Sequence, residues 1–333
     1  MKRAPSAIVA IPIRPGDEVR GARRTCSLLL LAFLGLTVAR PLAAQVPEAR
    51  AWDAGASAWV EAGAMADALA RYDVVFVGEQ HDDPATHRFE AALLEALGRR
   101  ARTLIVSLEM FERDVQPLLD EHVIGHVADS AFRVGSRPWS NYDADYRPLV
   151  QAAAARRWPV LAANVPRPLA SAVSRGGLAA LDTLPDAHRR WFAAQRSCAP
   201  EGEYFRRFGE AMGGMGGHGA AADTAASRAM LVRFYQAQCI KDETMAESIV
   251  RARQAWPGWK VVHYNGAFHS DHRLGTVERL ARRLPDARIA VVAVVPVPDP
   301  ATADPAAHAG RGDYVVFVPA PAAPVAPRTP GAP

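Results

Sequence analysis

Five short runs of apolar, largely β-branched residues constrain the fold of this chain more than any other feature. They occupy residues 74–77, 103–108, 159–163, 260–264 and 289–295. None of the runs alternates with polar residues, and such a run is typical of a strand that is covered on both faces. Helix-like stretches lie between them, at residues 86–99, 145–157, 241–256 and 274–284. Alternating strands and helices predict an α/β fold with a mostly parallel sheet flanked by helices.

A longer section, residues 166–240, interrupts this alternation. We expect it to form a helical insertion that caps one end of the sheet. Within it, the glycine-rich residues 212–219 are expected to form a mobile loop. After residue 298 the chain is rich in proline and alanine, and we expect disorder there apart from an edge strand at 314–318. These expectations divide the chain into a domain at 45–298 and a tail at 299–333.

Residues 1–44 have the organisation of a cleavable signal peptide. Arg23 and Arg24 precede the apolar run 27–36, which is too short to span a bilayer, and small residues lead to Ala44, where we expect cleavage. The arginine pair leaves twin-arginine export open as an alternative to the general secretory route. Cys26 lies before the apolar run, so a lipid-anchored cysteine at the cleavage point is not indicated. We therefore expect a periplasmic or secreted protein that is soluble after cleavage.

The net positive charge of the whole chain comes from residues 1–44. The chain has 39 Lys and Arg against 35 Asp and Glu, and residues 1–44 hold seven of the former and two of the latter. The remainder carries 32 basic and 33 acidic side chains, a net charge of about −1. Because it has no basic stripe, we expect no nucleic-acid partner.

Cys198 and Cys239 are the only cysteines that remain after the leader is removed. In an oxidising compartment we expect them to form a disulfide. On the chain-entropy model, closing a loop of about 40 residues stabilises the fold by about 3 to 4 kcal/mol. Two buried free thiols are the alternative.

Six polar side chains follow the predicted strands at the points where these strands end. They are Glu79, His81, Glu109, Asn164, Arg167 and His269. Open parallel sheets place their sites at this edge, so we expect the six side chains to converge. Two imidazoles and two carboxylates suit a transition metal, and an imidazole beside a carboxylate equally suits the activation of water. Taken singly, each residue has a structural alternative, such as helix capping by Glu79 or an ion pair between Glu109 and Arg167.

Several short motifs, taken in the order in which they occur along the chain, resemble those of the ChaN-like haem-binding uptake family. They are Gly78-Glu79-Gln80-His81, Glu109, Asn164-Val165-Pro166-Arg167, the segment 241–246 and Gly266-Ala267-Phe268-His269. The resemblance covers about residues 60–298, and the family shares a superfamily with Tiki-type metalloproteases and erythromycin esterases. It implies an exported protein that binds haem without a covalent bond and is associated with iron uptake. It also implies a homodimer around two stacked haems, as in the structurally known example of the family. This chain departs from that example because no lipoprotein cysteine stands at the expected cleavage site, so we expect the membrane tether to be absent or to be supplied by a membrane-bound uptake partner.

The resemblance further implies that tyrosine holds the haem iron. Tyr142 and Tyr146 are the candidates, and Tyr142 is preferred because it precedes the helix expected at 145–157 and can project from a loop. Packing of the ring alone is the alternative for either tyrosine. The other candidate haem contacts are Asn164, Arg167 and His218, with Arg133 and Arg137 as further partners for the propionates.

The superfamily leaves a second class of function open. In a metal-dependent hydrolase, Glu79, His81, Glu109 and His269 would be the catalytic residues. His81, Glu109 and His269 would then hold a divalent metal. A third reading is an interaction domain whose site has decayed. We favour haem binding because this form of the motif set occurs in an exported single domain.

Overall fold

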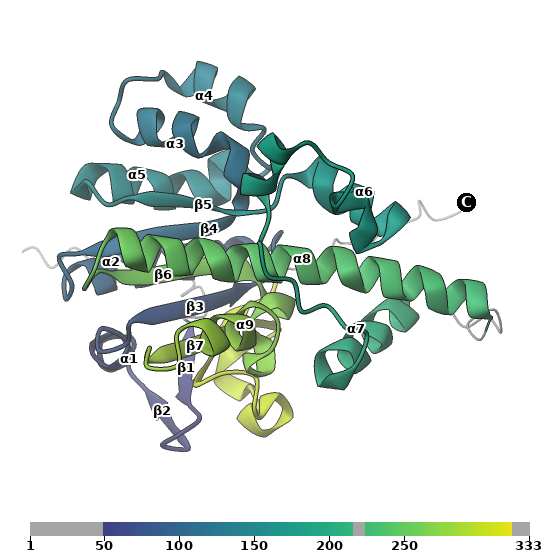
Figure 1. Ribbon diagram of the computed structural model, residues 1–333. Helices are drawn as coiled ribbons and strands as arrows, with labels where there is room; N and C mark the ends of the chain where they lie inside the picture. Colours follow the sequence, from purple (N-terminus) through teal and green to yellow (C-terminus); the bar gives the residue numbers. More distant parts are fainter. Residues whose placement is uncertain (1–48, 216–223, 322–333) are drawn as a thin grey trace, which may run out of the picture. The chain divides into compact units, whose positions relative to one another are not determined.

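The computed structural model describes residues 49–215 and 224–321, which form one eight-stranded sheet with helices on both faces (Figure 1). The strand order is β2-β1-β8-β7-β3-β6-β4-β5. The strands are β1 (Arg50–Asp53), β2 (Ala58–Val60), β3 (Val74–Glu79), β4 (Leu104–Glu112), β5 (Val160–Asn164), β6 (Lys260–Gly266), β7 (Ile289–Val297) and β8 (Tyr314–Pro319). The strands from β8 to β5 run parallel, whereas β1 is antiparallel to β2 and β8. The α/β fold with a mostly parallel sheet is therefore confirmed.

Successive residues of the central strands face opposite sides of the sheet, and helices bury both sides. The helices are α1 (Ala62–Leu69), α2 (Pro84–Gly98), α3 (Gln116–Val123), α4 (Asp129–Ser136), α5 (Arg147–Arg156), α6 (Arg167–Gly176), α7 (Gly202–Met215), α8 (Ala225–Ala255) and α9 (Thr276–Arg283). Val75 and Val77 of β3 belong to the core that includes residues of α1, α2 and α5. Val74 and Phe76 pack in a second core with α8 and α9. Because apolar side chains point both ways, the strand has no polar face.

The expected helical insertion contains α6, α7 and the first half of α8. Figure 1 shows α8 running along the sheet and continuing beyond it, with α6 and α7 beside the projecting part. The predicted disulfide between Cys198 and Cys239 is present. Cys239, on α8, packs in a buried cluster with Tyr204 and Phe208 of α7. Residues 212–215 belong to α7 and not to the expected glycine-rich loop, and residues 216–219 lie outside the described residues.

The prediction of a disordered tail with one edge strand is wrong in two respects. β8 lies inside the sheet, between β7 and β1, because the hairpin of β1 and β2 covers it. Trp52 and Trp59 of this hairpin pack against Val315 and Phe317 of β8. The segment before β8 is also structured, with short 3-10 helices at Pro300–Thr302 and Pro305–His308. The described fold thus continues to residue 321.

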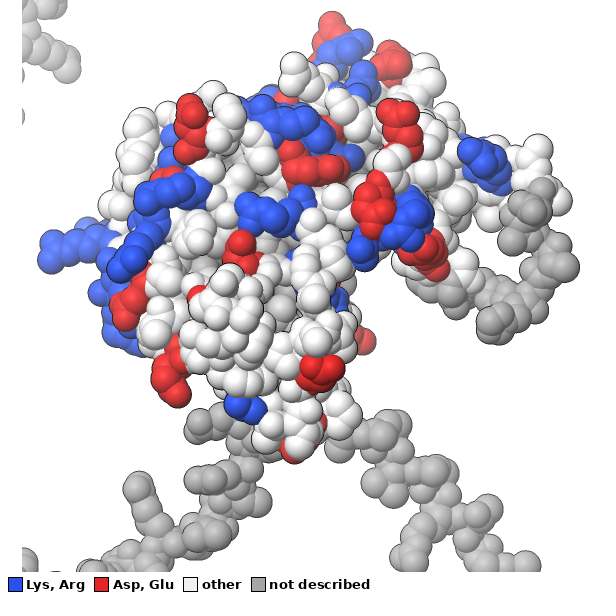
Figure 2. Space-filling model, turned by 90° about the horizontal axis from the view of Figure 1, so that it is seen from below, with Lys and Arg blue, Asp and Glu red and all other residues white. Residues whose placement is uncertain are grey.

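Charged side chains of both signs are mixed on the surface. On the face in Figure 2, Lys and Arg lie beside Asp and Glu over much of the area. Many charged side chains of the described residues form ion pairs, such as those of Arg206 with Glu203 and Glu210. Within residues 49–215 and 224–321, none of the helices combines the length and the apolar character needed to cross a membrane.

Candidate functional site

Four of the predicted residues gather around the carboxyl end of β6. The backbone N–H of Gly266, the last residue of β6, donates to Glu109 Oε2 at 2.8 Å. A Cβ placed on Gly266 would lie only 2.6 Å from His81 Nε2, so the His81 ring rests against this backbone. Glu79 and His269 bond to His81 and Glu109 respectively. The parallel strands therefore bring these four side chains together, as their positions at the strand ends predict.

The first half of this site is the pair of Glu79 and His81. His81 Nδ1 lies 2.6 Å from Glu79 Oε1, and the Tyr146 hydroxyl donates to the same oxygen at 2.7 Å. Burial acts to lower the pKa of His81, but the bond to Glu79 and the charge of Glu109 outweigh it and raise that pKa. The side chain of His81 is 43% exposed, whereas that of Glu79 is fully buried. His81 is therefore the member of this pair that a ligand can reach.

The second half is a buried chain of acid and imidazole groups. The Tyr204 hydroxyl donates to Asp242 Oδ2 at 2.7 Å, and Asp242 Oδ1 lies 2.7 Å from His269 Nδ1. His269 Nε2 lies 3.2 Å from Glu109 Oε1. Burial acts to lower the pKa of His269, but Glu109 and Asp242 raise it to about 9. Burial acts to raise the pKa of Glu109, but the charge of His269 brings it well below its usual range. At neutral pH His269 is therefore a cation between two carboxylates.

Asp242 was not assigned a role from the sequence. Asp242 belongs to α8 and does not follow a strand in the sequence, and its side chain is completely buried. The signal that pointed to it was the segment 241–246, which contributes to the family resemblance and contains Asp242.

Asn164 and Arg167 contact residues other than His81 and His269. Asn164 Oδ1 accepts a hydrogen bond from the backbone N–H of Val165, which shapes the turn after β5. Arg167 is exposed at the start of α6, and its nearest ion pair is with Glu112, at 3.6 Å. Glu109 bonds instead to His269 and Gly266, so the alternative of a Glu109–Arg167 ion pair is wrong.

The other arginines considered for propionates are engaged in ion pairs. Arg137 donates to Glu112 and Asp114, and Arg133 donates to Asp129 and Asp143.

Neither candidate tyrosine presents its hydroxyl at the surface. Tyr142 does not project from a loop as expected: it opens the π-helical turn Tyr142–Tyr146 and is 3% exposed. Its ring contacts those of Phe111 and Phe132, and this burial raises the pKa of Tyr142 to about 12. Tyr146 is completely buried. Tyr142 belongs to the core because it packs against Phe111 and Phe132, which come from other elements, β4 and α4. His218 lies outside the described residues.

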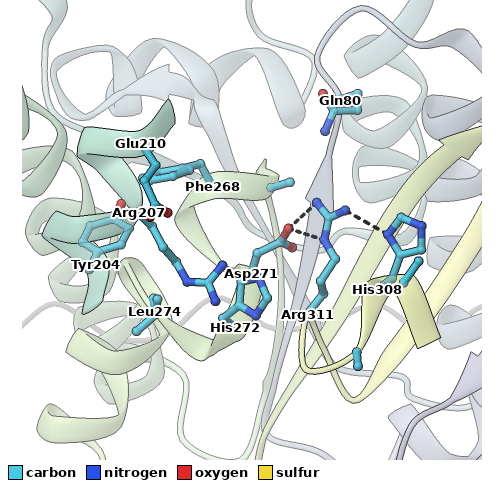
Figure 3. Close-up of a pocket in the computed structure, with 13 residues that line it drawn as sticks. Gln80, Tyr204, Arg207, Glu210, Phe268, Asp271, His272, Leu274, His308 and Arg311 are labelled. Atoms are coloured by element: carbon cyan, nitrogen blue, oxygen red, sulfur yellow. Dashed lines mark hydrogen bonds and ion pairs between the residues drawn. The ribbon is translucent and has the colours of Figure 1, made fainter. Parts of the chain in front are cut away.

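A pocket of about 530 Å³ opens beside this site (Figure 3). Gln80 and Phe268, which precede His81 and His269, line it together with Tyr204, whose hydroxyl bonds to Asp242. The rings of Tyr204 and Phe268 lie 5.2 Å apart between centroids. The basic side chains of the pocket are Arg207, His272, His308 and Arg311. Aromatic rings and cationic groups therefore share one cavity next to the strand ends.

The basic groups of the pocket differ in how far they are neutralised. Arg311 donates to Asp271 through two nitrogens. Arg207 donates to Glu203 through Nε, and Figure 3 shows its guanidinium near His272. Burial and the positive charge of Arg207 lower the pKa of His272. The lowered pKa favours the neutral imidazole of His272, in which one ring nitrogen is an acceptor.

The substitution Gly266→Ala tests whether the His81 ring depends on the close approach of this backbone. The added methyl group would lie 2.6 Å from His81 Nε2. Because His81 is partly exposed and can move, we expect a loss of unfolding free energy below about 1 kcal/mol and a pKa of His81 that falls towards its ordinary value. NMR titration of the imidazole measures this pKa. An unchanged pKa would show that the ring does not depend on Gly266.

Gly78→Ala is the contrasting variant. Its methyl group would meet Ser270 Oγ at 2.7 Å and the backbone of Ala267 at 3.2 Å. Both neighbours are buried, so we expect a larger destabilisation, of about 1 to 3 kcal/mol.

Comparisons with known proteins agree with the motifs. Residues 65–280 match the family described as haem-binding uptake, Tiki superfamily, ChaN. A structure of cofacial haem binding to ChaN of Campylobacter jejuni is similar, with a TM-score of 0.59 and 16% identity, covering 81% of this chain and 96% of that one. A mutant of the erythromycin esterase EreC in its open conformation gives a TM-score of 0.41 and 12% identity, covering 77% and 78% of the two chains. No curated protein matches. The family match spans well over half of the sequence, and the chain belongs to the ChaN family of haem-binding uptake proteins in the Tiki superfamily.

Proposed function

We propose that this chain is an exported haem-binding protein that handles haem in iron uptake. The observation that carries the proposal is the family match over residues 65–280. The fold shared with ChaN of Campylobacter jejuni supports it, as does the disulfide, which is typical of proteins from oxidising compartments. The family also favours a homodimer and a membrane-bound uptake partner.

The pocket beside the strand ends has donors that fit haem. His272 and His308 carry imidazole nitrogens, which are common axial ligands of haem iron, and His308 Nδ1 would have to give up the hydrogen bond that it accepts from Arg311. Tyr204 and Phe268 offer ring faces, and the guanidinium of Arg207 suits a propionate. Bound haem would supply an iron that takes one or two axial ligands. The residues of the chain would hold and orient it.

In their present positions, the two tyrosines that the resemblance implies are less suited to bind haem iron than the imidazoles of the pocket. Tyr142 would have to leave its contacts with Phe111 and Phe132, and Tyr146 would have to give up its hydrogen bond to Glu79. The two modes of ligation can be separated by experiment, because a change of axial ligand alters the visible spectrum of haem.

A haemin titration of the purified protein, followed in the Soret region, tests the function and the ligand together. We expect saturable binding by the wild type, and at least about tenfold weaker binding with a shifted Soret band for His272→Ala or His308→Ala. Tyr142→Phe, Tyr146→Phe and His81→Ala should keep the wild-type spectrum. Altered spectra in the tyrosine variants alone would restore tyrosine ligation. The absence of saturable binding by the wild type would overturn the proposed function.

Arg207 and Arg206 provide a matched pair for the same titration. Both donate to Glu203, but only Arg207 lines the pocket. We expect Arg207→Ala to weaken haemin binding and Arg206→Ala to leave it unchanged. Equal effects would remove the role of Arg207 in holding a propionate.

A hydrolase remains the second candidate, and the pairing of Asp242 with His269 favours it. A carboxylate behind a histidine is the arrangement that orients a metal ligand. In this reading, His81, Glu109 and His269 would hold a divalent metal, and Glu79 would act as the base. Loss of ester or peptide hydrolysis in Glu109→Gln, with haemin binding unchanged, would support the hydrolase.

A further inference from the structure

A second buried group is formed by Glu79, His87 and Glu90, of which none lines the pocket of Figure 3. Glu79 ends β3, and His87 and Glu90 lie three residues apart on α2, so their side chains share one face of the helix. None of the three residues is more than 3% exposed. One suitable atom from each, two carboxylate oxygens and one imidazole nitrogen, all lie within 4.8 Å of one another. The haem proposal makes no use of His87 or Glu90.

The hydrogen bonds of His87 determine which nitrogen faces the carboxylates. Nε2 lies 3.0 Å from the backbone oxygen of His81, which can only accept, so Nε2 carries the proton. In the neutral ring, Nδ1 then has a free lone pair. Nδ1 lies 2.9 Å from Glu90 Oε2 and 3.9 Å from Glu79 Oε2. The lone pair therefore points at acceptors.

The carboxylates face each other without a donor between them. Glu79 Oε1 already accepts from Tyr146 and bonds to His81. Among the described residues, Glu79 Oε2 and Glu90 Oε1 have no hydrogen-bond partner although both are buried. Unpaired acceptors in a dry interior are costly, so Glu79 Oε2, Glu90 Oε1 and His87 Nδ1 require either a proton or a cation among them. Burial and the charge of Glu79 raise the pKa of Glu90, so a proton on Glu90 is the alternative to a cation.

We propose that Glu79, His87 and Glu90 form a buried site for a divalent transition-metal cation. One imidazole and two carboxylates are a ligand set that such ions accept, and the two carboxylates would neutralise the charge of the ion. The bond from Nε2 to the His81 backbone provides the outer support that orients a ligating histidine. Glu79 would bind the ion through Oε2 and hold His81 through Oε1. The ion would thus stabilise the turn that carries the exposed imidazole.

Titration of the chelator-treated protein with Co²⁺ tests this site, because cobalt bound through an imidazole nitrogen absorbs in the visible range. We expect about one Co²⁺ per chain in the wild type, confirmed by elemental analysis. Glu90→Gln should abolish this binding, since it keeps the shape of the side chain and adds a donor for His87 Nδ1. Glu109→Gln is the matched control, a buried strand-end carboxylate outside the group, and should retain binding. Circular dichroism verifies that both variants fold.

Two results would overturn the site. If the wild type takes up no cobalt, a proton on His87 or Glu90 fills the space among the acceptors. If Glu109→Gln loses cobalt while Glu90→Gln keeps it, the ion binds at His81, Glu109 and His269 instead. Both results are independent of haemin binding, because the titration uses the metal ion alone.

Discussion

Replacing Cys198 and Cys239 by serine is expected to lower the free energy of unfolding by about 3 to 4 kcal/mol. The two cysteines are 41 residues apart, so their bond removes a large loop from the conformations open to the unfolded chain. Cys239 is also completely buried on α8, next to the guanidinium of Arg279. Because the bond joins α8 to the segment before α7, its loss should loosen the insertion first.

Urea denaturation of the oxidised wild type, the reduced wild type and the double serine variant measures this effect. The reduced protein should match the variant within about 1 kcal/mol, since both have lost the loop constraint. Titration of free thiols provides the control for the oxidation state. A loss below about 1 kcal/mol in both would mean that the bond does not constrain the unfolded chain as the entropy model requires.

Raising the pH from 6.5 to 9 is expected to lower the free energy of unfolding by a few kcal/mol. The pKa of His269 is about 9 in the folded protein, against about 6.5 in an unfolded chain. The folded state therefore binds the proton more tightly. The contribution is complete below pH 6.5, where both states are protonated, and it is lost as the pH rises through 9. The raised pKa of His81 adds a slope of the same sign.

The variant His269→Gln isolates the contribution of His269 to the pH dependence of the free energy of unfolding. It should remove most of the slope, and at pH 6.5 it should cost about 3 to 5 kcal/mol, because Asp242 and Glu109 stay buried without their cation. His126→Gln is the matched control: His126 pairs with Glu121 at the surface, where such a pair contributes less than about 1 kcal/mol. A wild-type slope that survives in His269→Gln would assign the titration to another group.

Much of the fold followed from patterns within single segments. The five apolar runs are all strands, because burial on both faces leaves a local signature. The hairpin of β1 and β2 was missed, since strands of four and three residues carry too little pattern. Its absence from the prediction also explains why β8 was expected at the edge of the sheet.

In the site too, residues were predictable where the local sequence determines their position, and not where contacts between distant segments do. Glu79, His81, Glu109 and His269 could be grouped because strand direction alone places them at one edge. Asp242 could not, since its approach to His269 depends on how α8 crosses the sheet. The sequence places Tyr142 in a loop because it precedes the helix expected at 145–157. Its burial cannot be predicted locally, because the aromatic side chains that pack on it come from β4 and α4.

The place of β8 in the sheet has a consequence for how the protein reaches its native state. β1 pairs with β8, so Arg50 at one end of the described chain lies opposite Phe317 near the other. A contact this distant in sequence forms slowly, because nearly the whole chain must be ordered before it closes. During synthesis, the hairpin of β1 and β2 cannot pair with β8 until residues 314–319 have left the ribosome. The sheet is therefore completed only after its last strand has been synthesised.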